Sequence, residues 1–363
     1  MLLILIVTTV IYCFIVLLVL FTLVKKRGFH KTIDTPYITV VISARNEEKR
    51  IKPTLECLTR LTYPEDKYEI IIVDDASRDK TAEIIEEYTS KYDNWNIVRI
   101  HEKSGKLKGK KAALKIAITM AKGEIILTTD ADCILPQDWL FAMASVFDND
   151  TVMVLGHSLL LKRKSWLNWL LRFDNLFTAI LMTASTNLGF PITSMGSNLA
   201  YKKKSYFESG GYDELSAHKS GDDVHLTELF RRKIKGKIIS NFITESFIYS
   251  QAPDSIKEIF FMQIRKNSKI LRKSIPSVLF SLLLFSYHLG LIVFPFLNPS
   301  LITQWFLLLL IKLGCEFITL SVAAKKFSNL SLIPLIPVMQ IFYPVYVSVL
   351  AVLGIFQKYE WKK

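Results

Sequence analysis

The stretch EIIIVDDASRDKTAEIIEEY, residues 69–88, contains the change of pattern that decides the fold class. Its first part, residues 69–73, is a short apolar run rich in β-branched side chains, which is typical of a strand buried on both faces. Two acidic residues, Asp74 and Asp75, follow directly, and residues 80–88 have helical spacing. The stretch therefore predicts a buried strand, a polar loop and a helix, which together form one unit of an α/β fold.

The same order of elements occurs on both sides of this stretch. Before it, the β-branched run 38–42 opens into the polar segment SARNEE, and helical spacing continues to about residue 61. After it, we expect strands at 96–100 and 124–128, separated by a helix over 110–121. This alternation predicts a mainly parallel sheet with helices on both faces, in which ligands bind at the carboxyl ends of the strands. No G-x-G-x-x-G opens the first helix, which disfavours a dinucleotide-binding fold.

Long apolar stretches flank this region, and 50% of the 363 residues are hydrophobic. Residues 2–24 carry no charge, are long enough to cross a bilayer, and end at the basic cluster 25–27. A signal peptide carries its positive charge before its apolar run, so we predict an uncleaved anchor with its C-terminal end in the cytoplasm. Three further stretches have spanning length, at 276–297, 301–324 and 332–356.

Three crossings after a cytoplasmic domain would leave the basic C-terminal tail outside, against the positive-inside tendency. The last stretch is interrupted by Pro334, Pro337 and Pro344, so we predict that it re-enters or lies shallowly in the membrane. The predicted organisation has four parts: an N-terminal anchor at 1–27, a cytoplasmic domain at 28–254, an interfacial amphipathic helix at 255–275 and transmembrane or re-entrant helices at 276–363.

The formal net charge of +13 raises the question of an anionic partner. Basic clusters occur at 162–164, 202–204, 231–237 and 265–273. No nucleic-acid motif accompanies them, so we expect anionic lipid headgroups rather than nucleic acid as their partner, or simple solvation of the charges. The four cysteines show no paired spacing, which argues against both a disulfide framework and a zinc site.

Three acidic pairs follow predicted strands or loops, and each has two interpretations. In TTDADC, Asp130 and Asp132 can approach one divalent ion, Mg²⁺ or Mn²⁺, that offsets charge on a diphosphate leaving group; turns also favour Asp for other reasons. Asp74 and Asp75 would be unfavourable at a buried strand end without donors, which a nucleoside could supply, although one of them could instead cap a helix.

The third pair, Asp222 and Asp223, lies in SGDDVHLT before a segment with helical spacing. An attacking acceptor hydroxyl must lose its proton, so Asp223 is the candidate general base, and helix capping is the alternative. In GKKAALK, a glycine precedes a helix whose N-terminal amides and Lys110 could meet phosphate; a solvated basic helix start is the competing interpretation.

In this order the segments resemble the family 2 glycosyltransferases of the GT-A fold, especially the membrane-integrated members related to cellulose, chitin and hyaluronan synthases. The resemblance covers most of the predicted cytoplasmic domain. It rests on six segments: VISARNEE, IIVDDASRDKT, GKKAALK, TTDADC, MGSNLAYKKKSYFESGGYDE and SGDDVHLT. It implies an inverting enzyme, a hexosyl- or N-acetylhexosaminyltransferase, that converts an α-linked nucleotide sugar into a β-linked product by direct displacement.

The resemblance also implies roles for individual residues. Asp223 would be the general base, and Asp130 with Asp132 would bind the metal. The nucleotide-sugar pocket would be formed by Ala44, Arg45, Glu47, Asp74, Asp75, Lys110, Asp130 and Asp132. The acceptor side would be formed by Gly196, Ser197, Asp222 and Gln263.

One departure from the family pattern bears on the product. Processive members carry Gln-x-x-Arg-Trp on an interfacial helix, whereas this chain has Gln263, Lys266 and Asn267 in the corresponding segment, without the Trp ring that helps form their acceptor site. We therefore expect the transfer of a single sugar from a UDP-sugar donor to a lipid or lipid-linked saccharide acceptor. The reaction would take place at the cytoplasmic face of a bacterial membrane. The alternatives are a processive synthase that exports a β-linked glycan and a non-catalytic nucleotide-binding scaffold.

Overall fold

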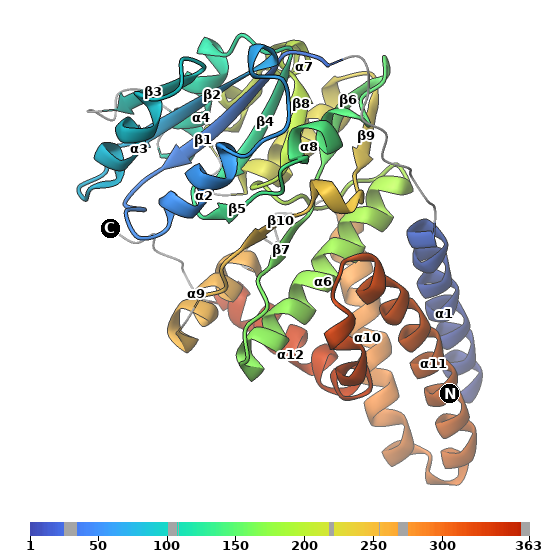
Figure 1. Cartoon of the computed structure of the whole chain (residues 1–363). Coiled ribbons are helices and arrows are strands. Elements are labelled where there is room, and N and C mark those ends of the chain that lie inside the picture. Colours follow the sequence, from blue (N-terminus) through green and yellow to red (C-terminus); the bar gives the residue numbers. More distant parts are fainter. Residues whose placement is uncertain are drawn as a thin grey trace. The chain divides into compact units, whose positions relative to one another are not determined.

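The computed structural model describes residues 1–24, 35–100, 107, 109–217, 221–253, 255–267 and 275–356. The predicted basic cluster at 25–27 and the C-terminal lysines lie outside these residues. The chain divides into two compact units, which are coloured along the sequence in Figure 1. One unit combines Met1–Lys25 with Ala252–Lys363, and the other is Lys26–Gln251.

The unit Lys26–Gln251 contains a seven-stranded sheet of order β3-β2-β1-β4-β8-β6-β9. Its strands are β1 (Ile38–Ala44), β2 (Tyr68–Asp75), β3 (Trp95–Ile100), β4 (Ile125–Asp130), β6 (Thr151–Leu155), β8 (Leu199–Lys202) and β9 (Lys237–Ser240). β1 to β4 are mutually parallel, β8 is antiparallel to β4 and β6, and β6 is parallel to β9. The predicted mainly parallel sheet is confirmed, as are the four predicted strands.

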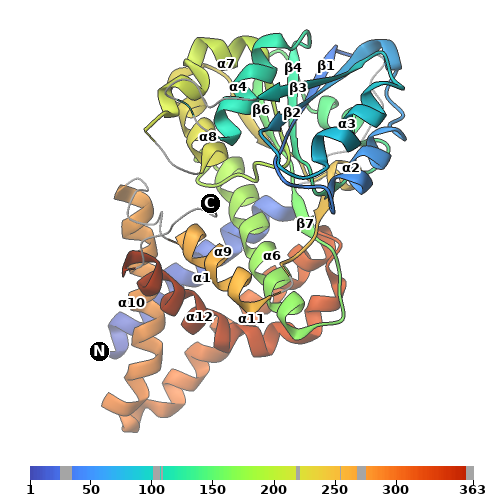
Figure 2. The same cartoon turned by 90° about the vertical axis from the view of Figure 1, so that its left-hand side faces the viewer.

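A smaller sheet of order β5-β10-β7 lies in the same unit. Its strands are β5 (Cys133–Ile134), β7 (Ser158–Leu160) and β10 (Ile248–Ser250). The α-helices are α2 (Ile51–Leu58), α3 (Thr81–Thr89), α4 (Lys110–Met120), α5 (Trp139–Ala144), α6 (Trp166–Asn187), α7 (Lys203–Ser209) and α8 (Asp222–Lys233). Short 3-10 helices are η1 (Glu65–Lys67), η2 (Gly211–Leu215) and η3 (Thr244–Ser246). Figure 2 shows helices on both faces of the large sheet.

The core explains why helices cover both faces of this sheet. Successive residues of a strand point to opposite faces. On one face Val40 and Ile42 of β1 pack in a cluster with Leu55 of α2 and Leu140 of α5. Val41 between them is also fully buried, and α4 packs against β1 and β2. Because each such aliphatic side chain stabilises the fold by roughly 1.5–3 kcal/mol on burial, both faces need cover.

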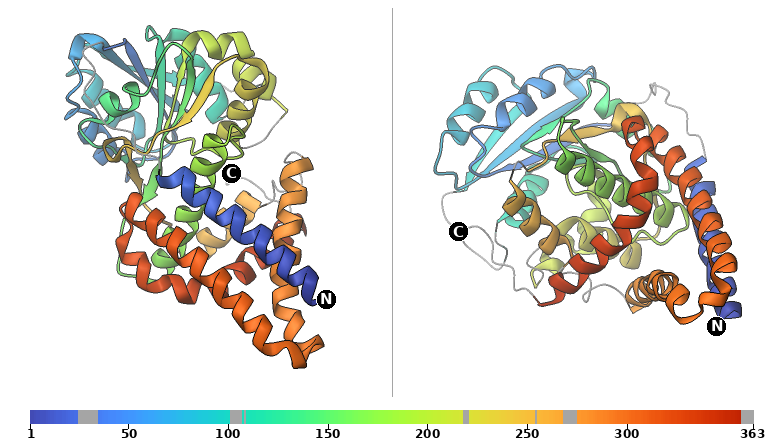
Figure 3. Two further views of the ribbon diagram at one scale, coloured as in Figure 1. Left: turned by 90° about the vertical axis from the view of Figure 1, so that its right-hand side faces the viewer. Right: turned by 90° about the horizontal axis from the view of Figure 1, so that it is seen from below.

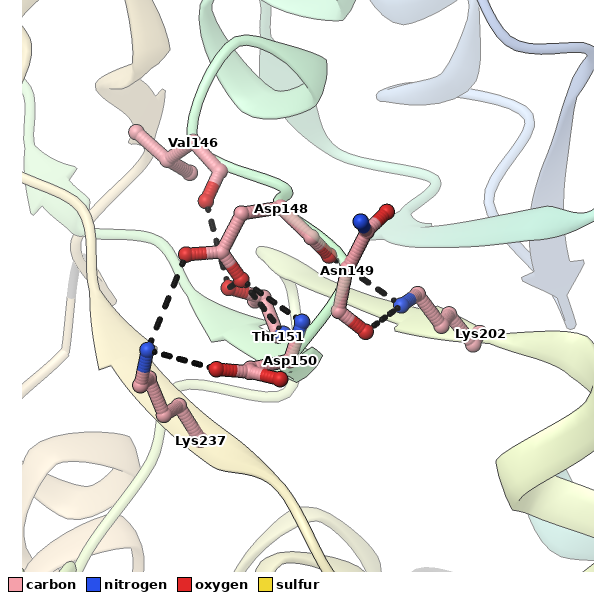
Figure 4. Close-up of polar contacts among 7 residues, drawn as sticks. All are labelled: Val146, Asp148, Asn149, Asp150, Thr151, Lys202 and Lys237. Atoms are coloured by element: carbon pink, nitrogen blue, oxygen red, sulfur yellow. Dashed lines mark hydrogen bonds and ion pairs between the residues drawn. The ribbon is translucent and has the colours of Figure 1, made fainter.

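The turn before β6 fastens three strands of the sheet together (Figure 4). The carboxylate of Asp148 accepts bonds from the Thr151 hydroxyl at 2.6 Å and the Thr151 amide at 2.7 Å. Lys237 of β9 bonds Asp150 at 3.0 Å, and Lys202 of β8 donates to the Asp148 carbonyl at 3.1 Å. The hydrogen bond from Thr151 lowers the pKa of the Asp148 carboxyl, which favours its charged form 3.9 Å from the Lys237 ammonium.

The second unit is helical. Its elements are α1 (Leu2–Val24), α9 (Ile256–Asn267), α10 (Ile275–Leu297), η5 (Pro299–Leu301), α11 (Ile302–Lys326), η6 (Leu330–Leu335) and α12 (Ile336–Phe356). Figure 3 shows α1 running alongside α11. Within the described residues, three segments have the length and apolar character needed to cross a membrane, which are Leu2–Val24, Pro299–Lys326 and Leu330–Leu350. The re-entrant path of the last of these stays a prediction.

A polar network lies among the apolar helices of this unit. The Lys312 ammonium is 2.9 Å from Glu316 Oε1, one turn further along α11, and the Lys312 side chain is only 3% exposed. Tyr12 of α1 donates its hydroxyl to Glu316, and Gln340 of α12 donates to Glu316 Oε2 at 3.1 Å. Glu316 therefore joins three helices through polar contacts.

Candidate active site

The loops after β1 and β2 meet at the carboxyl edge of the sheet. Arg45, which follows β1, places Nη1 3.6 Å from Asp75 Oδ2 at the end of β2. Ala44, the last residue of β1, is buried. A Cβ added to Gly109 would lie 3.9 Å from Asp75 Oδ2, so the N-terminus of α4 also reaches this carboxylate. The parallel strands thus bring together groups that are far apart in the sequence.

Backbone amides lock these two loops to each other. The amide of Asn46 donates to Ser77 Oγ at 3.0 Å, and the amide of Glu47 donates to Thr81 Oγ1 at 2.8 Å. In return the Asn46 side chain accepts a bond from the Arg78 amide at 2.9 Å. Asn46 adopts a φ of 55°, a left-handed conformation that Asn tolerates better than most residues. These bonds fix the backbone on both sides of Arg45.

The two carboxylate oxygens of Asp74 have different surroundings. Its Oδ2 accepts a bond from the Ser77 amide at 3.3 Å, which holds the turn after β2. The capping alternative is wrong for this pair, because the N-cap of α3 is Lys80 and α3 has no side-chain capping bond. The other, Oδ1, is buried and has no hydrogen-bond partner within the described part of the chain. A buried carboxylate oxygen without a donor is unfavourable, so this atom suits a ligand that brings one.

Three carboxylates converge at the end of β4. Asp130 ends the strand, and Asp132 follows in the turn. Burial, and then the charge of Asp130, raise the pKa of the Asp132 carboxyl. Burial, and then the charges of Asp132 and Asp130, likewise raise the pKa of Glu47 in the loop after β1. The mutual repulsion shows that this corner favours a positive charge.

Lys110 supplies one such charge from the first turn of α4. Its ammonium forms an ion pair with Asp130. Burial would lower the pKa of Lys110, but Asp130 outweighs it, and Asp223 and Asp222 add to the effect, which raises that pKa to about 12. Lys110 is therefore charged at neutral pH, and it interacts electrostatically with the carboxylates of both β4 and α8. The predicted metal pair and the predicted base belong to one electrostatic site.

The residues also fit a divalent cation that shares its coordination with a substrate. Among the described residues, no group of three or more His, Cys, Asp or Glu side chains is arranged to hold a metal ion by itself. Mg²⁺ and similar hard ions, however, are commonly bound through one or two carboxylates plus substrate phosphates and water, rather than in a complete protein cage. Asp130 and Asp132 supply that donor set.

Asp222 and Asp223 begin α8 but do not cap it. The N-cap residue is Gly221, with a φ of 86°, and the helix has no side-chain capping bond. Asp223 lies against Gly196, because a Cβ added there would come within 3.0 Å of the Asp223 Cβ and 3.2 Å of its Cγ. The predicted acceptor-side glycine and the predicted base are thus in contact across the site.

Asn198 sets the position of the turn that contains Gly196. Its amide nitrogen Nδ2 donates to the carbonyls of His157 at 2.9 Å and Ser246 at 2.8 Å, and its Oδ1 accepts a bond from Trp139 at 3.0 Å. Ser197, the other acceptor-side candidate in this turn, is half-buried. The remaining candidate, Gln263, is buried in α9 and so belongs to the helical unit.

Lys111, next to Lys110, is a further residue of this site that was not predicted from the sequence. Its side chain is 7% exposed, and its ammonium donates to the Leu215 carbonyl at 3.0 Å. A run of lysines at a helix start is usually solvated, so the residue type gives no warning of burial. The sequence does contain one indication, which is that Lys111 directly follows Lys110 in a predicted helix. Adjacent helical positions face about 100° apart, so the two lysine side chains cannot share one environment.

Comparisons with known proteins bear on the family and the fold of this domain. A family model described as Glycosyl transferase family 2 matches residues 39–206. The glycosyltransferase AglE of Haloferax volcanii is 34% identical over 125 residues, which is 34% of this chain and 40% of that protein. A beta-monoglucosyldiacylglycerol synthase of Nostoc sp. is 32% identical over 130 residues, which is 35% of this chain and 27% of that protein. The chain therefore spans less than half the length of either relative.

One solved structure matches almost the whole chain. It is the mannosyltransferase PcManGT from Pyrobaculum calidifontis, in complex with GDP-Man and Mn²⁺. The TM-score is 0.59 at 20% identity, and the match covers 95% of this chain and 92% of that one. At this identity the likeness concerns the fold alone. It confirms the predicted GT-A fold with apolar helices at both ends.

Proposed function

Residues 39–206 form a family 2 glycosyltransferase domain, and from this premise we propose that the chain transfers one sugar from a UDP-sugar to a lipid or lipid-linked saccharide acceptor. The observation that carries the proposal is one arrangement around β4, in which Lys110 pairs with Asp130 and Asp223 contacts Gly196, whose carbonyl is hydrogen-bonded to that strand. It joins groups suited to a diphosphate leaving group with a carboxylate suited to removing a proton, and glycosyl transfer needs both.

The donor half of the proposal rests on β1, β2 and α4. The unpaired Oδ1 of Asp74 could accept a bond from a base imide N–H, and Asp75 could accept from a ribose hydroxyl, while Arg45 holds Asp75 in place. Lys110 could meet the diphosphate from the start of α4, where backbone amides also favour anions. A divalent cation on Asp130 and Asp132 would stabilise the charge that develops on that diphosphate.

In the proposed chemical step, one bond forms, one bond breaks and one proton moves. An acceptor hydroxyl oxygen forms a bond to the anomeric carbon while the bond from that carbon to the diphosphate oxygen breaks. The hydroxyl proton passes to Asp223, and the electron pair of the broken bond leaves with the diphosphate, next to Lys110. Attack opposite the leaving group inverts the configuration, so an α-linked donor gives a β-linked product.

The acceptor half rests on the apolar helices. A chain with three helices able to cross a membrane among its described residues is suited to an acceptor that is itself anchored there. One relative is named as a synthase of monoglucosyldiacylglycerol, so its product is a sugar on a membrane lipid. With Asn267 in place of the aromatic ring of processive enzymes, single transfer is favoured over chain growth. We place the domain on the cytoplasmic side of the membrane.

The proposal is tested by nucleotide release from the full chain in lipid nanodiscs. UDP-glucose, UDP-GlcNAc, UDP-galactose and GDP-mannose are offered in turn with Mg²⁺ or Mn²⁺ and with diacylglycerol or a polyprenyl phosphate. We expect UDP release that requires both a lipid acceptor and the metal, and one added sugar by mass spectrometry. A ladder of products would favour the processive alternative, and metal-dependent UDP binding without any turnover would favour a scaffold.

Gly196→Ala should impair catalysis without weakening donor binding. The added methyl group would lie 3.0 Å from the Asp223 Cβ, so the carboxylate must shift by a few tenths of an ångström. Because small misplacements of reacting groups are costly, we expect kcat to fall roughly tenfold with the UDP dissociation constant unchanged. Gly314→Ala in α11 is the control, since its φ is not positive and a Cβ added there would meet nothing within 4 Å. An equal loss in both variants would contradict the contact argument.

A further inference from the structure

The lysines of α4 face different parts of the site. Lys110 forms its ion pair with Asp130, at the end of β4. Lys111, the next residue, points instead toward η2 and α8, where its ammonium lies 3.0 Å from the Leu215 carbonyl and 3.6 Å from Asp222 Oδ1. Helix α4 therefore contacts the metal-binding corner through one residue and the start of the base-bearing helix through the next.

Burial strengthens the electrostatic contacts of Lys111. Its side chain is 7% exposed and that of Asp222 is 21% exposed, so water screens this pair much less than a surface pair. A buried ammonium must be matched by acceptors, and removing one partner leaves the other uncompensated. The Leu215 carbonyl and Asp222 are thereby held to a fixed distance from α4. Both are far along the chain from Lys111, and Asp222 is the residue directly before Asp223.

Asp223 also contacts the turn before β8. Gly196 contacts it there, and the Gly196 carbonyl accepts a bond from Thr128 of β4 at 3.3 Å. Asp223 thus lies between a turn tied to β4 and a helix start tied to α4. Neither tie is formed by Asp223 itself, so the position of its carboxylate depends on its neighbours.

We propose that Lys111 is a positioning residue, which acts through Asp222 to hold Asp223 at the correct distance from Lys110 and the donor. This rests on the proposed function for the role of Asp223, although the tether itself does not. Lys111 contributes no contact to the donor in this scheme. Its loss should therefore lower kcat and leave nucleotide binding intact, whereas a loss of fold would lower both.

A double-mutant cycle on the full chain in nanodiscs tests the path through Asp222. Turnover is measured as UDP release from UDP-glucose with diacylglycerol vesicles and Mn²⁺, and UDP affinity is measured separately. We expect Lys111→Met and Asp222→Asn each to lower kcat by about tenfold, and the double variant to be no slower than the slower single variant, because both act on one contact. Multiplying losses would overturn the proposal, as would a loss confined to UDP affinity.

Lys115→Met is the matched control. Lys115 lies one turn along α4 and pairs with Asp213 of η2 at 2.7 Å, but both side chains are exposed, at 42% and 62%. Exposed pairs contribute little, so kcat should change less than twofold. A tenfold loss in this variant would show that any lysine of α4 has the effect, which would overturn the specific role of Lys111.

Hydrogen exchange tests the tether without using activity. In Lys111→Met we expect faster exchange in the first turn of α8, where the His225 amide bonds the Gly221 carbonyl at 2.9 Å. Exchange in β1 and β4 should be unchanged, which shows that the domain is folded. If wild type releases no UDP, the proposed function fails and exchange alone decides the tether. Unchanged exchange at the start of α8 would overturn it.

Discussion

Asp223→Asn is expected to lower kcat by about 10²–10⁴-fold and to leave the affinity for UDP unchanged. Asparagine keeps the size and polarity of the side chain but cannot accept the proton of the attacking hydroxyl. Asp223 begins α8 without capping it, so the substitution removes no capping bond from the helix. The variant should be compared with wild type in the full chain, by single-turnover sugar transfer and by UDP binding with Mn²⁺.

Asp213→Asn provides the control for this experiment. It makes the same chemical change in η2 at an exposed side chain whose partner is the exposed Lys115, and it should retain full turnover. Equal turnover of Asp223→Asn and wild type would exclude Asp223 as the base. A loss of UDP affinity as large as the loss of kcat would place Asp223 on the donor side instead.

The strands and their order along the chain could be predicted because fully buried parallel strands have a composition of their own. Each of β1, β2 and β4 contains an unbroken run of three or four apolar residues, which polar or acidic residues follow. Those polar residues had to lie at one edge once the sheet was parallel. The convergence of Asp75, Asp130 and Arg45 was therefore accessible from sequence.

Other features depend on tertiary contacts that no local pattern contains. β8 has only four residues and lies antiparallel between β4 and β6. Its place could not be predicted without knowing the order of all the strands in the sheet. Lys111 looks like a surface residue until η2 covers it. The left-handed turn at Asn46 is likewise visible only when the loop after β2 accepts its amide. Each of these bonds joins segments at least thirty residues apart, beyond the reach of periodicity.

The second large effect is expected on the stability of the helical unit, from the polar network around Glu316. Lys312→Met should lower the free energy of unfolding of the helical unit by roughly 3 kcal/mol, because it leaves the Glu316 carboxylate charged and without its cation in an apolar environment. Among the described residues, Glu316 would keep the bonds from Tyr12 and Gln340. Replacing both charges, as Lys312→Met with Glu316→Gln, should recover most of the loss, since no unpaired charge then remains.

Thiol labelling of Cys13 in nanodiscs measures this loss within the helical unit. Cys13 is buried in α1, so its reaction with a maleimide requires the helices to open, and a loss of roughly 3 kcal/mol should accelerate labelling about 100-fold. Cys133, buried in the other unit, should react at the wild-type rate. Lys325→Met, at the exposed end of α11, should change neither rate. If the single and double variants label equally fast, Glu316 is neutral in the folded protein and the contribution of Lys312 is packing rather than charge.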